Sequence, residues 1–150
     1  MQLVFSKKKH QQQLAKPNFV EQEMTSSELN YLMAIDRLYS GAKGIKLVSI
    51  AERMGVTKVS VFRAAKLLEH DGLIQRDDKN KVVITRYGYE QLEKYRVLIA
   101  WLGNHLERNC KVSHETAVRD AMGAVCAFSE ESINALSNSI STEREKRNDR

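Results

Sequence analysis

Five polar side chains near the start of residues 57 to 70 could together bind a polyanion. They are Thr57, Lys58, Ser60, Arg63 and Lys66. The apolar residues of the same segment, Val61, Ala64, Ala65 and Leu68, recur at helical spacings, which predicts a helix with one buried and one exposed face. An arginine on the exposed face can pair bidentately with guanine, and lysines suit phosphate oxygens. The ordinary alternative is a solvated helix with surface lysines.

The segments around residues 57 to 70 predict where this helix is held. "LVSIAERMGV" predicts a shorter helix that stops at Gly55, after which Thr57 can cap the next one. Upstream, "TSSELNYLMAIDRLYSG" predicts a helix that begins with a capping box between Thr25 and Glu28. Downstream, "LIQRDDKNKVVIT" reads as two strands joined by a polar turn. Three helices followed by a hairpin form a winged helix-turn-helix, whose second motif helix enters the major groove of DNA.

Two features of this predicted domain bear on its partner. Thr57 and Ser60 lie at the helix N-terminus, where hydroxyl and free amide groups favour a phosphate. The hairpin tip offers Arg76, Lys79 and Lys81 to an adjacent groove or backbone, although the two aspartates beside them would repel phosphate. Winged domains also serve as protein-interaction modules, and that alternative stays open.

The second half of the chain predicts an assembly domain. Thr85 can cap a long helix over residues 86 to 108, whose apolar positions step by three and four residues. Val97, Leu98 and Trp101 widen this apolar surface beyond what a winged domain can cover. Ser113 and Ser129 can cap two further helices. These patterns predict a mainly α protein: flexible arm 1–24, winged helix-turn-helix 25–88, helical dimerisation domain 89–140 and charged tail 141–150.

Composition and charge narrow the class of protein. Residues 25 to 88 hold 11 lysines and arginines against 7 aspartates and glutamates, whereas residues 89 to 140 hold 5 against 7. A basic module beside a slightly acidic one suits a double-stranded DNA binder with a separate assembly domain. Two cysteines and no long apolar stretch predict a cytoplasmic protein without a membrane segment. No glycine-rich phosphate loop and no H-E-x-x-H motif is present, so we expect no enzyme.

Over residues 25 to 137 the sequence resembles the diphtheria toxin repressor and manganese transport regulator family. The stretches that carry the resemblance are "SSELNYLMAIDRLY", "VSIAERMGVTKVSVFRAAKLLEHDGLIQRD", "VVITRYGYEQLEKYR" and "VRDAMGAVCAFSEESINAL". The resemblance implies a homodimeric transcriptional repressor that binds palindromic operator DNA. It further implies that a divalent metal, manganese or iron, joins the first helix to the dimerisation domain.

The positions that the resemblance assigns to metal ligands differ from the family pattern. They hold Asn30, Met33, Val97, Met122, Val125 and Cys126. Manganese and iron(II) prefer carboxylate and imidazole ligands, and none of these side chains supplies either.

Three interpretations of these positions remain open. The site has been lost and its residues are core; or Met33, Met122 and Cys126 bind a soft metal such as copper(I). The third is a hard-metal site displaced to other residues, for instance Asp36, His105, His114, Glu115 or Asp120. Cys126 could also sense a thiol-reactive effector, although a buried cysteine is more often packed as a small apolar residue.

Overall fold

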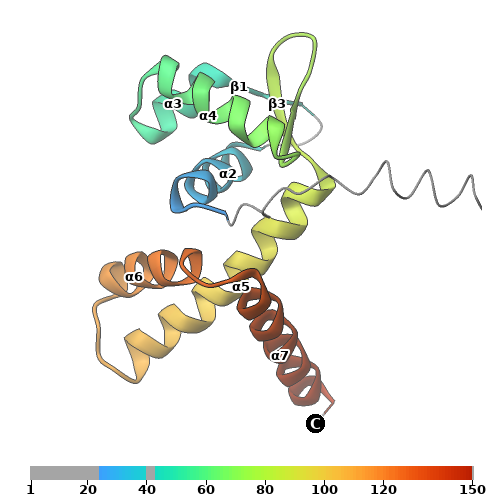
Figure 1. Ribbon diagram of the computed structural model, residues 1–150. Helices are drawn as coiled ribbons and strands as arrows, with labels where there is room; N and C mark the ends of the chain where they lie inside the picture. Colours follow the sequence, from blue (N-terminus) through green and yellow to red (C-terminus); the bar gives the residue numbers. More distant parts are fainter. Residues whose placement is uncertain (1–23, 40–42, 150) are drawn as a thin grey trace, which may run out of the picture.

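The computed structural model describes residues 24–39 and 43–149 and shows a mainly α protein with one small sheet (Figure 1). The elements in chain order are α2 (Ser26–Leu38), β1 (Ile45–Lys46), α3 (Leu47–Met54), α4 (Lys58–His70), β2 (Ile74–Arg76), β3 (Lys81–Ile84), α5 (Arg86–Arg108), α6 (His114–Cys126) and α7 (Glu130–Asn148). Figure 1 shows α5 running from the winged domain to the layer that α6 and α7 form. The predicted fold class, a winged helix-turn-helix followed by a helical domain, is confirmed.

Short polar caps set where the helices begin. Thr25 and Glu28 form both hydrogen bonds of the capping box at the start of α2. At the starts of the later long helices the cap side chain accepts from the third backbone amide of the helix, as at Thr57, Thr85, Ser113 and Ser129. Gly55 ends α3 in the left-handed conformation with φ 66°, which favours glycine.

The sheet has three antiparallel strands in the order β1-β3-β2. Ile74 pairs with Ile84 and Ile45 with Val82, so the buried side chains of the three strands lie over the helices of the winged domain. The hairpin of β2 and β3 is the predicted one. The strand β1 was not predicted, because two residues are too few to show the alternation of apolar and polar residues that marks a strand.

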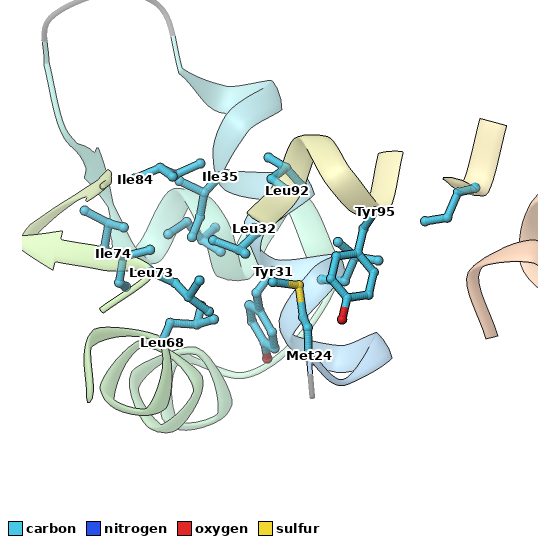
Figure 2. Close-up of a cluster of buried hydrophobic side chains, with 14 of the residues drawn as sticks. Met24, Tyr31, Leu32, Ile35, Leu68, Leu73, Ile74, Ile84, Leu92 and Tyr95 are labelled. Carbon is cyan, nitrogen blue, oxygen red and sulfur yellow. The ribbon is translucent and has the colours of Figure 1, made fainter. Parts of the chain in front are cut away.

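The core of the winged domain joins α2, α4, the sheet and the first half of α5 (Figure 2). Its largest fully buried side chains include Leu29, Leu32, Ile50, Leu68, Ile74 and Leu92. Figure 2 shows the sulfur of Met24 between Tyr31 and Tyr95, and Met24 is only 6% exposed. The last residue of the predicted arm is therefore packed in the core, while residues 1–23 of that arm lie outside the described residues.

The first turn of α5 is held tightly against the chain that follows α4. The Thr85 hydroxyl donates to the carbonyl of Gly72 at 2.6 Å, and the Thr85 amide donates to the carbonyl of Leu73 at 3.0 Å. A Cβ on Gly88 would stand 2.1 Å from the Leu73 carbonyl oxygen. Only glycine allows this approach, so the direction in which α5 leaves the winged domain is set here.

Helix α5 also packs against α6 and α7. Ala117, Ala121 and Val125 of α6 are fully buried against α5, because their small side chains let the helices approach closely. Lys94 of α5 donates to the side chain of Asn134 in α7 at 3.1 Å. Helix α7 continues through residues 141–148, part of the predicted charged tail, and their side chains are exposed.

We predict that Gly88→Ala destabilises the protein by roughly 1–3 kcal/mol, because the new methyl group meets backbone that cannot move aside. The matched control is Gly123→Ala in α6, where a Cβ meets nothing within 4 Å. This control should stabilise by about 0.5–1 kcal/mol through higher helix propensity. Urea unfolding followed by circular dichroism gives both values. Equal midpoints for the two variants would contradict the tight approach at Gly88.

Candidate nucleic-acid interface

The outer face of α4 carries a continuous exposed stripe. Val59, Phe62, Arg63 and Lys66 are spaced at i, i+3, i+4 and i+7, which places them on one side of the helix, and all four are exposed. Val61, Ala65 and Leu68 lie on the opposite side and are at most 5% exposed. The predicted division of α4 into a buried and a cation-bearing face is therefore what the structure shows.

The N-terminus of α4 is ordered by two hydroxyl groups. Thr57 Oγ1 accepts from the Ser60 amide at 3.1 Å, and the two hydroxyl oxygens lie 2.9 Å apart, joined by one hydrogen bond. Lys58 and Arg63 make no ion pair with any of the described residues. Their charges are therefore available to a partner on this face.

Phe62 lies beneath two cations. Lys66 Nζ is 4.7 Å from the centre of its ring, and the Arg76 guanidinium carbon is 5.5 Å from it. Arg76 also donates through Nη2 and Nε to the Glu69 carboxylate at 2.6 and 2.9 Å. Only 16% of the Arg76 side chain is exposed, so this residue joins β2 to α4 instead of extending from the hairpin as the sequence suggested.

The hairpin tip is shaped by Asp77. Its carboxylate accepts from the amides of Lys79 and Lys81 at 2.9 and 2.8 Å, and Asn80 takes a left-handed φ of 62°. Lys79 and Asp78 remain exposed, and Lys81 is half-buried in β3. Asp77 is thus engaged in forming the turn, and Lys79 is the most outward of the predicted hairpin cations.

An ion pair connects the winged domain to α5 on the side of α2. Arg96 of α5 donates to the Asp36 carboxylate of α2, and both side chains are partly buried. Burial and the neighbouring Asp36 carboxylate raise the pKa of the Tyr89 hydroxyl above its ordinary value of 10.0. Tyr89 is therefore a neutral neighbour of this pair at physiological pH.

The positions that the family resemblance assigns to metal ligands are mostly apolar packing positions. Met33, Val97, Met122 and Cys126 pack partly buried against the core, Val125 is completely buried, and Asn30 is exposed. This donor set does not fit manganese or iron(II), because it contains neither carboxylate nor imidazole.

Cys126 and Met33, two of the three sulfur-bearing side chains, lie at different places along α2. The Cys126 thiol lies beside the Ser26 side chain in the first turn of α2. Met33 lies seven residues further on, about 10 Å along the helix axis, where it lines a pocket together with Val118. The structure does not bring Cys126 and Met33 to one point, and the soft-metal site stays a prediction.

The candidates for a displaced metal site are also separated. Asp36 binds Arg96, His114 Nδ1 lies 2.9 Å from Glu107 Oε2, His105 contacts Asn109, and Asp120 contacts Arg119. Glu115 is exposed. Among residues 24–39 and 43–149, no three histidine, cysteine, aspartate or glutamate side chains gather as a metal site would need.

The solved structures that match this fold include the following three. The hypothetical protein SSo2273 from Sulfolobus solfataricus is 25% identical, with a TM-score of 0.61 over 78% of this chain and 89% of that one. The manganese regulator SloR is 19% identical, with a TM-score of 0.62 over 79% of this chain and 55% of its own. IdeR from T. acidophilum is 22% identical, with a TM-score of 0.54 over 76% and 54%.

These likenesses define the class of fold: a winged helix-turn-helix with a helical domain, as in SloR and IdeR. The chain spans about half the length of SloR and of IdeR. No protein-family model and no curated protein matches the sequence. In the part of the chain that the structure describes, no helix is long and apolar enough to cross a bilayer.

We predict that the two cysteines differ in reactivity. Cys110 is exposed, whereas burial and the Glu28 carboxylate raise the pKa of the half-buried Cys126 thiol, outweighing the Ser26 hydrogen bond that lowers it. A raised pKa means less thiolate at neutral pH, so a disulfide reagent should label Cys110 first and Cys126 slowly, faster as pH rises. Ellman's reagent with the wild type and Cys110→Ser measures both phases. Fast labelling of native Cys110→Ser at pH 7 would instead support a thiol-sensing role for Cys126.

Proposed function

We propose that this chain is a DNA-binding transcriptional regulator that acts as a cytoplasmic homodimer. The observation that carries the proposal is the exposed stripe of α4 in the second position of a helix-turn-helix, with two cations on its outer face. Residues 57 to 68 contain no aspartate or glutamate, so the electrostatic attraction of this face for phosphate is unopposed along three turns. The manganese regulator SloR, which shares the fold, is consistent with a regulatory role.

In the proposed complex the first turns of α4 lie in the major groove. Arg63 is the base-reading residue, because its planar fork matches the two acceptors of guanine. Val59, on the same stripe one turn earlier, is 60% exposed and can contact a thymine methyl group. Val59 is not among the five polar candidates that the sequence indicates on this helix, because it is apolar. Its exposure next to Arg63 indicates that it belongs to the same face.

The remaining contacts go to the DNA backbone. Lys58 and Lys66 flank the base-reading residues and reach phosphates, and Thr57 and Ser60 lie beside the free amides of the first turn of α4. At the hairpin tip, Lys79 reaches the backbone of the adjacent groove, with Lys81 behind it. These contacts set affinity and register rather than sequence preference.

The proposed regulator does not use a hard metal at the positions of the family. Asp36 and Arg96 instead provide a direct connection between α2 and α5 that is made by protein groups alone. A homodimer brings two α4 helices to the two halves of a palindromic site, and the dimer sets their separation.

The dimer surface that we propose lies on α5 and α6. Trp101 is 45% and Val118 39% exposed, and next to them Ala100, Gly103 and Val118 line an apolar pocket of about 290 Å³. A tryptophan left this exposed in a helical domain is typical of a contact between chains. The second chain would cover this surface beside the winged domain, whose Met33 in α2 also lines the pocket.

We predict that Arg63→Ala and Lys66→Ala weaken DNA binding in different ways. Arg63→Ala should lose affinity for a selected site by about 1–3 kcal/mol while affinity for random DNA changes little. Lys66→Ala should weaken both and reduce the salt slope by about 1, because one phosphate contact is lost. Fluorescence anisotropy on selected and random duplexes over a salt series measures both effects. Equal losses on both DNAs for Arg63→Ala would refute its base-reading role.

We predict that the wild type has twice the 17.2 kDa mass of one chain and that Trp101→Glu is a monomer. A carboxylate placed in a buried apolar contact loses its hydration without gaining a partner. Size-exclusion chromatography with light scattering gives the masses. The control is Leu67→Glu, which places the same charge on a 59% exposed position of α4 and should leave the dimer intact. A dimeric Trp101→Glu would place the interface elsewhere.

A further inference from the structure

Glu69 is an acidic residue on the side of α4 that faces the hairpin, where a negative charge should repel DNA. It is the first carboxylate after the basic stretch of residues 57 to 68. Its side chain is 38% exposed, so it is not buried out of reach of a phosphate backbone. An acidic residue kept on a DNA-facing surface is expected to have another role that offsets its repulsion of phosphate.

The contacts of Glu69 indicate that this role is to hold Arg76. Its Oε2 atom accepts from two nitrogens of Arg76, the last residue of β2, so a single carboxylate oxygen fixes the orientation of the guanidinium plane. Charge-assisted pairs of this kind are stronger and more directional than neutral hydrogen bonds. The two residues are seven positions apart, and their pair joins the last turn of α4 to the strand that leads into the hairpin tip.

Phe62 completes the cluster from the exposed stripe. The Arg76 guanidinium lies 5.5 Å from the centre of the Phe62 ring, and Lys66 Nζ lies 4.7 Å from it. Both distances are within the range at which the π face of the ring attracts a cation. Arg76 thus touches α4 at two points, Glu69 and Phe62, and the ring that it touches also orders Lys66.

We propose that Glu69 and Arg76 are positioning residues that fix the hairpin relative to α4, so that Lys79 at the tip and Arg63 on α4 meet DNA in one register. This inference rests on the proposed function and assigns Arg76 no direct phosphate contact. It predicts an unusual direction of change in DNA affinity. Removing the negative charge of Glu69 from the DNA-binding surface should weaken binding. If Arg76 contacted phosphate directly, loss of Glu69 should instead strengthen binding, because it would free the guanidinium.

The test compares Glu69→Ala with Asp78→Ala by anisotropy on the selected duplex and on random DNA. Asp78 is an exposed acid at the hairpin tip, with no hydrogen bond or ion pair to any described residue, so its removal should strengthen binding slightly. Glu69→Ala should weaken binding to the selected duplex by about three- to tenfold, the loss expected when one backbone contact is misplaced. The melting temperature of each variant shows whether it is folded.

Two further variants separate positioning from simple loss of structure. Glu69→Gln keeps an oxygen that can accept from Arg76 and should recover part of the selective binding. Arg76→Met combined with Glu69→Ala should bind no worse than either alone, since both break the same contact. If Glu69→Ala binds as well as or better than the wild type, the positioning role is wrong while the proposed function stands. If the wild type binds no duplex at all, the proposed function itself fails.

Discussion

The constraint on which the structure depends is the close approach of the first turn of α5 to the backbone carbonyl of Leu73. Gly88 and the Thr85 cap together lock α5 to the turn that follows α4. The proposed dimer surface lies at the far end of α5. The contact at Gly88 and Thr85 therefore holds the winged domain in a fixed position relative to that surface. The distance between the two α4 helices of a dimer is then set by backbone packing that no flexible linker interrupts.

Most of the fold could be predicted from local signals in the sequence. Thr57, Thr85, Ser113 and Ser129 are followed by helical apolar spacing, and each begins a helix because its side chain satisfies an amide that the helix leaves free. The strand β1 was missed because two residues carry no periodicity. The burial of Met24 was missed because it depends partly on Tyr95 of α5, which is distant in the sequence.

The sequence predicted which side chains of the candidate site face outward, but not which of them contact one another. Periodicity places Arg63 and Lys66 outward, and the structure agrees. It cannot show that Arg76 folds back onto Glu69 and Phe62, since that depends on where β2 meets α4 in space. In the same way, the spacing of Met33 and Cys126 allowed a common site, whereas the crossing of α2 and α6 sets the Cys126 thiol against Ser26.

The measurement that tests the account most directly is binding of chelator-treated protein to genomic duplex fragments over a salt series, repeated with manganese, iron(II), zinc and copper(I). We expect selective binding without metal, a logarithm of the binding constant that falls linearly with the logarithm of salt concentration, and no response to manganese or iron(II). Selective binding that appears only with manganese or iron(II) would show that a hard-metal site exists despite the apolar ligand positions. No binding to any fragment under any condition would contradict the account as a whole and favour a protein-interaction module.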